Sequence, residues 1–190
     1  MRIFFGATIP EETKNEIIDI QSGLRARVPD ARFEGRDKLH ITLQFIGDFS
    51  AERVDELYNS SVGRLRENLG HATEVEVVGP GYFPNENARR GIWLECRDDG
   101  TLAAIADSLK SSTRQFGIVP ESRQFKAHIT IARTRGHEAG GMRRIDLQKA
   151  WDEGKLSAKR FFPKSVALFQ SRLLPSGSEY EIIHEFLLQH

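Results

Sequence analysis

Hydrophobic and polar positions follow two different periods along the chain, and together they predict an α+β fold. Apolar and alternating runs predict strands at 2–9, 39–47, 74–83, 91–96, 127–134, 159–173 and 179–188. Apolar residues at helical spacing predict helices at 10–28, 51–69 and 101–116, with a short helical segment at 143–151. Strands and helices therefore alternate through most of the chain.

The order of these elements repeats in the two halves of the chain. Each half has a strand, a helix, a turn with proline, and then a strand that contains His-Ile-Thr. The tripeptide occurs at 40–42 and at 128–130, so the two copies are 88 residues apart. The strand before each helix also matches, because Phe4 lies 36 residues before the first histidine and Trp93 lies 35 residues before the second.

This internal duplication predicts one bilobal domain over residues 1–190. The first repeat covers about 1–83 and the second about 91–190, and the polar, turn-rich residues 84–90 form the junction. Few strands per half and the lack of a Gly-rich nucleotide loop favour two mostly antiparallel sheets that flank a central cleft, with helices outside. Pseudo-two-fold symmetry would bring the two His-Ile-Thr strands together at that cleft.

Side chains alternate between the two faces of a strand, so the His and Thr of each copy point the same way. His40 and Thr42 share one face while Ile41 points into the core, and His128 and Thr130 share the corresponding face. A single strand of this kind is most often structural. Two copies at matching places favour a shared site of two imidazoles and two hydroxyls.

Such a constellation fits phosphoryl transfer without a metal. A histidine has an ordinary pKa near ~6.5, so one imidazole takes a proton from the nucleophile while the other gives one to the leaving group. The threonine hydroxyls donate hydrogen bonds to the non-bridging phosphate oxygens. One acid and one base predict a bell-shaped dependence of the rate on pH.

The two copies differ five residues after the histidine. The second copy has Arg133 there, whose guanidinium would bind the phosphate, and the first copy has Phe45. Arg133 stands three residues after Thr130, an odd offset that places it on the opposite face of a regular strand, so it reaches the site only where the strand bends or ends. Phe45 either packs in the core or stacks on a nucleobase.

Composition and charge set broad limits on function. Lys+Arg and Asp+Glu both number 27, so a general nucleic-acid coat is not indicated, although a local basic site remains open. The single cysteine, Cys96, excludes an intrachain disulfide and is expected to be a small buried hydrophobe. The N-terminus does not read as a signal peptide, and no run reaches the ~18 apolar residues of a membrane helix. We expect a cytoplasmic monomer with no membrane partner.

The two motifs carry a family resemblance. LHITLQFIGDF at 39–49 and AHITIAR at 127–133 are similar to the paired HxTx motifs of the 2H phosphoesterase superfamily. Within it the chain resembles the bacterial and archaeal RNA 2′,3′-cyclic phosphodiesterases, historically called 2′-5′ RNA ligases. The resemblance extends over nearly the whole chain, including RIFFGATIP (2–10) and GYFPNENARRGIWLE (81–95). One departure is Ala127, where these relatives commonly have proline.

The resemblance implies a substrate and a role for each residue of the motifs. The partner would be an RNA end with a 2′,3′-cyclic phosphate, which water opens to a 2′-phosphomonoester. His40 would be the general acid for the departing 3′-oxygen and His128 the general base on water. Thr42, Thr130 and Arg133 would hold the phosphate. The family needs no metal and no other cofactor.

Other functions stay open at the level of sequence. One is a relative that acts on a small cyclic nucleotide phosphate or joins RNA ends through a 2′-5′ bond. Another is a non-catalytic module that binds RNA ends, although binding alone does not need two titratable imidazoles. The last is a purely structural duplication.

Overall fold

The computed structural model describes the whole chain except residues 69–70, 84–89, 135–145, 154–159, 176 and 190. The strands are β1 Arg2–Thr8, β2 Ala31–Phe33, β3 His40–Asp48, β4 Val75–Phe83, β5 Gly91–Arg97, β6 His128–Thr134, β7 Arg160–Phe161, β8 Ser165–Leu174 and β9 Gly177–Leu187. The helices are α1 Glu11–Arg25, α2 Val54–Asn68, α3 Thr101–Thr113 and α4 Leu147–Glu153. Short 3-10 turns lie at Arg36–Lys38, Ala51–Arg53 and Arg114–Phe116. The predicted junction lies outside the described residues except for Arg90.

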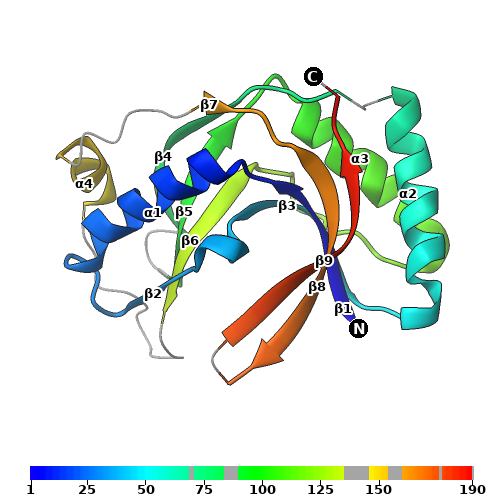
Figure 1. Cartoon of the computed structure of the whole chain (residues 1–190), viewed down its shortest axis with the longest axis horizontal. Helices are drawn as coiled ribbons and strands as arrows, with labels where there is room; N and C mark the ends of the chain where they lie inside the picture. The colour runs from blue at the N-terminus through cyan, green and yellow to red at the C-terminus, as the bar shows by residue number, and fades with distance from the viewer. Residues whose placement is uncertain (69–70, 84–89, 135–145, 154–159, 176, 190) are drawn as a thin grey trace.

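The strands form one curled sheet, and the pairings between them are antiparallel (Figure 1). Their order is β7-β4-β5-β6-β3-β1-β8-β9, and β2 pairs with β6. The α+β class is confirmed, but the expected two sheets are two halves of one sheet. The halves join where β3 meets β6 through a single residue pair, Ile41–Ile129.

The helices of the two halves are exchanged across the sheet. Gln21 of α1 donates a hydrogen bond to the carbonyl oxygen of Ile131 in β6, at 3.1 Å. Gln44 of β3 donates one to the hydroxyl of Thr113 in α3, at 2.6 Å. The helix of each half therefore packs against the His-Ile-Thr strand of the other half, with α1 and α4 on one side of the molecule and α2 and α3 on the other (Figure 1).

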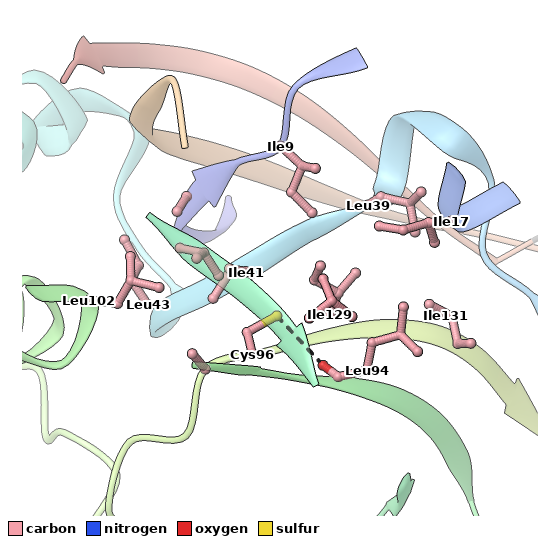
Figure 2. Close-up of a cluster of buried hydrophobic side chains, with 14 of the residues drawn as sticks. Ile9, Ile17, Leu39, Ile41, Leu43, Leu94, Cys96, Leu102, Ile129 and Ile131 are labelled. Atoms are coloured by element: carbon pink, nitrogen blue, oxygen red, sulfur yellow. Dashed lines mark hydrogen bonds between the residues drawn. The ribbon is translucent and has the colours of Figure 1, made fainter. Parts of the chain in front are cut away.

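The larger of two hydrophobic clusters fixes which way the two motif strands face. Ile41, Leu43, Ile129 and Ile131 are each at most 3% exposed and pack among side chains of β5 and α3 (Figure 2). Burying one such side chain stabilises the fold by about 1.5–3 kcal/mol, so turning either strand over is strongly disfavoured. The motif histidines and threonines must point away from this core.

Cys96 belongs to the same core, as the sequence predicts. Its side chain is 6% exposed and its thiol faces the carbonyl oxygen of Leu94, at 3.8 Å (Figure 2). Burial raises the pKa of the thiol to about 12, so it stays protonated and unreactive at neutral pH. Among the described helices, none has the length and apolar content that a membrane span requires.

Candidate active site

The two His-x-Thr motifs lie side by side on β3 and β6, which meet through their central isoleucines. Antiparallel register around this pair sets each histidine opposite the threonine of the other motif. Opposite side chains have Cβ atoms about 4.5–5.5 Å apart and diagonal ones, here the two histidines, about 7–8 Å. His40, Thr42, His128 and Thr130 are all half-buried and line a common groove.

Both imidazoles are held in the same way by the backbone. Nδ1 of His40 lies 2.6 Å from the carbonyl oxygen of Lys38, and Nδ1 of His128 lies 2.8 Å from that of Lys126. A carbonyl only accepts, so Nδ1 carries the proton and Nε2 of the neutral ring is an acceptor. The hydroxyl of Thr42 lies 3.0 Å from Nε2 of His40. Each ring thus presents its reactive nitrogen to the groove.

Burial keeps both rings neutral when the site holds no anion. Burial, aided by the positive charges of Arg133 and His128, lowers the pKa of His40 to about 4, although the hydrogen bond that the ring donates to the Lys38 carbonyl acts in the opposite direction. Burial, joined by the charge of Arg133, also lowers the pKa of His128. At neutral pH both rings are therefore neutral, and a negative charge in the groove would favour their protonated forms.

A β-bulge brings Arg133 to the side of the sheet that carries the motif. Thr130 pairs with Trp93 and Ala132 pairs with Ile92, so one extra residue of β6, Ile131, has no partner on β5. The bulge shifts the alternation by one residue, and both Ile131 and Ala132 are buried. Arg133 then emerges into the groove despite its odd offset from Thr130, which is how the predicted bend is achieved.

The same bulge occurs at the matching place in β3. Thr42 pairs with Gly6 and Gln44 with Phe5, which leaves Leu43 as the extra residue. Phe45 consequently emerges into the groove and is 40% exposed, so the alternative that it packs in the core is wrong. The match between the halves therefore extends to backbone irregularities that the sequence repeat did not reveal.

Arg133 is held in place by a residue that sequence reasoning missed. Its Nε donates to the carboxylate of Glu34 at 2.9 Å, and the side chain of Glu34 is only 16% exposed. Tyr180 of β9 lines the same cavity as Arg133, and burial and then the negative charge of Glu34 raise the pKa of its phenol. Neither residue stands within a motif, and only the folded chain brings them to the groove.

Aromatic rings surround the two histidines differently. Phe4 and Tyr180 lie 4.8 and 5.3 Å from His40 between ring centroids, whereas Trp93 lies 4.7 Å from His128. The residue of β1 that corresponds to Trp93 is Gly6, not Phe4, because each pairs with the motif threonine of its own half. The predicted match of Phe4 with Trp93 is therefore wrong by two residues.

Gly6 makes room for the His40 imidazole. A Cβ atom at this position would stand 3.2 Å from Cδ2 of His40 and 3.1 Å from the ring of Phe169. Both distances are shorter than ordinary van der Waals contact, so any side chain here displaces the imidazole or its supporting ring. The aromatic ring beside the histidine therefore comes from a different position of the neighbouring strand in each half, Phe4 in the first and Trp93 in the second.

Two adjoining cavities share Thr130 and Arg133. The larger, of about 320 Å³, is also lined by His40, Thr42 and Phe45, together with Arg2, Phe4, Ser171, Leu173, Ser178 and Tyr180. The smaller, of about 80 Å³, is also lined by His128, together with Phe83, Gly91, Ile92 and Trp93. All six predicted site residues therefore line this groove, with one histidine in each cavity.

Comparison with known proteins identifies the family. Residues 8–93 match the model of the LigT-like phosphoesterases. The RNA 2′,3′-cyclic phosphodiesterase of Escherichia coli is 31% identical over 134 residues, which cover 70% of this chain and 71% of the relative. This chain is a member of the LigT-like phosphoesterase family. It is therefore an enzyme, and the predicted membership of the 2H superfamily is confirmed.

The likeness extends over the full length of other relatives. The RNA 2′,3′-cyclic phosphodiesterase of Methanocaldococcus jannaschii is 28% identical over 188 residues, 98% of this chain and 100% of the relative. A crystal structure of a Thermus thermophilus protein superposes with a TM-score of 0.79 and 25% identity, covering 99% of this chain and 98% of that one. The crystal structure of E. coli LigT with 3′-AMP gives a TM-score of 0.72 at 23% identity, over 100% of this chain and 98% of that one, which shows the common fold.

Proposed function

We propose that this enzyme hydrolyses a terminal 2′,3′-cyclic phosphate of RNA to a 2′-phosphomonoester, by two-histidine acid–base catalysis without a metal. The observation that carries this proposal is the unequal size of the two cavities on either side of Thr130 and Arg133. The names of the E. coli and M. jannaschii relatives agree with this substrate.

The two cavities give the reaction a direction. About 320 Å³ beside His40 is within the range of about 300–1,000 Å³ that small-molecule pockets occupy, so the terminal nucleoside fits there. About 80 Å³ beside His128 has room for water but not for a nucleoside. Water therefore approaches from the His128 side, and the departing 3′-oxygen lies on the His40 side. This is the in-line arrangement that displacement at phosphorus needs.

Each residue then has a defined task. Nε2 of His128 takes a proton from water as the new bond from oxygen to phosphorus forms. The bond from phosphorus to the 3′-oxygen breaks, and Nε2–H of His40 gives that oxygen a proton. The hydroxyls of Thr42 and Thr130 and the guanidinium of Arg133 bind the non-bridging oxygens. No cluster of three or more metal-ligating side chains occurs in the described part of the chain.

The phosphate itself supplies the charge that makes His40 an acid. An anion about 4 Å away stabilises the imidazolium by about 4 kcal/mol at an effective dielectric constant of about 20. That energy corresponds to a rise of about three pKa units, which brings His40 from about 4 to near neutrality. Substrate binding thus favours the protonated form of His40 that the acid role needs.

The small cavity also separates this proposal from ligation. A 2′-5′ ligase needs room for a second nucleoside on the side of the attacking group, and about 80 Å³ does not provide it. A non-catalytic binding module has no need of two imidazoles whose Nε2 atoms both face the groove.

We also propose that residues 1–190 are one domain of two repeats, about 1–83 and 91–190. The matching bulges at Leu43 and Ile131 and the shared hydrophobic core support this division. The monomeric state and the cytoplasmic location stay predictions. Phe45 remains assigned to the substrate, on the wall of the larger cavity.

The decisive experiment compares His40→Ala and His128→Ala with His184→Ala on an oligonucleotide 2′,3′-cyclic phosphate. His184 is a matched control, because its imidazole contacts Asp55 at 2.7 Å and stacks on Tyr58, away from the groove. We expect both motif variants to lose at least about a hundredfold in kcat, as for a lost acid or base, and the control to retain its activity. Product mapping should place the phosphate on the 2′-oxygen, and EDTA should leave the rate unchanged.

Near-normal turnover by either motif variant would rule out the two-histidine mechanism. Phosphate on the 3′-oxygen would show that the 2′-oxygen departs, and would contradict the placement of the 3′-oxygen beside His40. Inhibition by EDTA, relieved by an added divalent cation, would show that a metal takes part.

A further inference from the structure

Arg2 is a cation in the larger cavity that the chemistry at phosphorus does not use. It is exposed at the start of β1 and lines the same cavity as His40 and Thr42. No carboxylate of a described residue forms an ion pair with it; Asp48 pairs with Arg2 only through the backbone. Arg133 differs, because its Nε already forms an ion pair with the carboxylate of Glu34.

The guanidinium of Arg2 has a defined position. Its Cζ atom lies 5.0 Å from the centre of the Phe45 ring, within the range of cation–π interaction. A guanidinium carries five N–H donors, so those that do not face the ring remain able to bind a phosphate. Phe45 is thus the support on which Arg2 rests, and that face of the ring is not open to a base.

The backbone distance along β1 is longer than the spacing of two adjacent phosphates, and the long side chain of Arg2 is able to span the difference. Gly6 pairs with Thr42 at the site of reaction, and Arg2 stands four residues before it. At about 3.3 Å per residue, the two positions are about 13 Å apart along the strand. The cavity of about 320 Å³ lies between them and has room for one nucleoside.

We infer that Arg2, held by Phe45, binds the phosphate on the 5′ side of the terminal nucleotide, so that the enzyme prefers an RNA chain over a mononucleoside 2′,3′-cyclic phosphate. This inference rests on the proposed function and adds a determinant of substrate length. Arg133 binds the phosphate that reacts, and Arg2 binds the phosphate one nucleotide upstream. Phe45 acts as a positioning residue for Arg2.

The test compares two substrates of which only the longer has an upstream phosphate. One is a dinucleotide with a terminal 2′,3′-cyclic phosphate, and the other is the mononucleoside 2′,3′-cyclic phosphate of the same terminal base. We expect the kcat/KM of the dinucleotide, divided by that of the mononucleoside, to fall about tenfold in Arg2→Gln. The variant loses a charged hydrogen bond that only the longer substrate forms. The slope of log kcat/KM against log salt for the dinucleotide should become shallower by about 0.7.

Arg172→Gln is the matched control, and two further variants separate binding from folding. Arg172 is an exposed residue of β8, next to Ser171, which pairs with Arg2, and it forms an ion pair with Glu181 at 2.8 Å. Its replacement removes the same charge outside the cavity and should leave the ratio unchanged. Arg2→Lys should retain part of the ratio. Phe45→Leu should lower it severalfold, because the cation loses its aromatic support.

The outcomes distinguish this inference from the proposed function. If the wild-type enzyme opens both cyclic phosphates but Arg2→Gln lowers neither rate, or lowers both equally, the proposed function stands and the inference is overturned. A ratio that falls as far in Arg172→Gln as in Arg2→Gln also overturns it, since charge alone then accounts for the effect. If the wild-type enzyme opens neither substrate, the proposed function itself fails.

Discussion

His40→Asn should make the free energy of unfolding less sensitive to pH. In the folded protein burial lowers the pKa of His40 to about 4, whereas an unfolded histidine has its ordinary value of 6.5. Between these values the unfolded chain binds more protons than the folded one, so acidification favours unfolding. Asparagine has no proton to gain in this range, and its amide nitrogen is placed to donate to the carbonyl of Lys38 as Nδ1 does.

The size of the effect follows from the two pKa values. The stability associated with His40 is highest above pH 6.5 and is lost as the pH falls toward 4. Between pH 8 and pH 5 the loss amounts to at most about 2 kcal/mol. This is a large part of the 5–15 kcal/mol typical of a domain, so it is readily measured. Stopping at pH 5 avoids most of the carboxylates, which titrate below it.

Urea unfolding at pH 8, 6.5 and 5, followed by fluorescence, measures the effect in the wild type and in His40→Asn. His128, whose pKa burial also lowers, is present in both proteins and cancels in the comparison. We expect the wild type to lose about 2 kcal/mol more than the variant, with equal denaturant m values. Parallel losses in the two proteins would refute the view that a neutral, buried imidazole stands at this position. Adding inorganic phosphate should reduce the difference, because the anion stabilises the charged ring.

Two further predictions concern catalysis. The alkaline limb of the kcat profile should lie at higher pH than that of kcat/KM, because the bound phosphate raises the pKa of His40 above its value in the free enzyme; coincident limbs would show that His40 is not the acid. Glu34→Gln should lower kcat severalfold, because Arg133 loses the charged partner that orients it. It should not raise KM, because the variant also removes a carboxylate that repels the substrate phosphate. Steady-state kinetics on a dinucleotide cyclic phosphate measures this split, and a higher KM at constant kcat would contradict it.

The parts of the site that the sequence predicts are those set by local alternation. His40 and Thr42 face the groove because a period of two leaves Ile41 no place but the core, and the second motif obeys the same rule. The strands, the long helices and the exposure of the four motif side chains follow from such patterns. They need no knowledge of which strand lies next to which.

What escaped prediction depends on contacts between distant segments. The bulges at Leu43 and Ile131 arise from pairing with β1 and β5, and no local pattern marks the extra residue. Glu34 and Tyr180 reach the groove only through the pairing of strands far apart in the sequence. The expected second sheet failed for the same reason, since the single pair that unites the halves has no sequence signature.

The exchange of helices between the halves limits how the groove is able to move. Because α1 contacts β6 and α3 contacts β3, moving the two halves apart would break the packing of each helix against its strand. Neither repeat should fold when expressed alone, since each would leave an apolar helix face and a motif strand uncovered. The separation of the two imidazoles is therefore set by the fixed pairing of the adjacent strands β3 and β6, and not by a hinge. Under the proposed function, the five-membered cyclic phosphate would enter a gap of constant width.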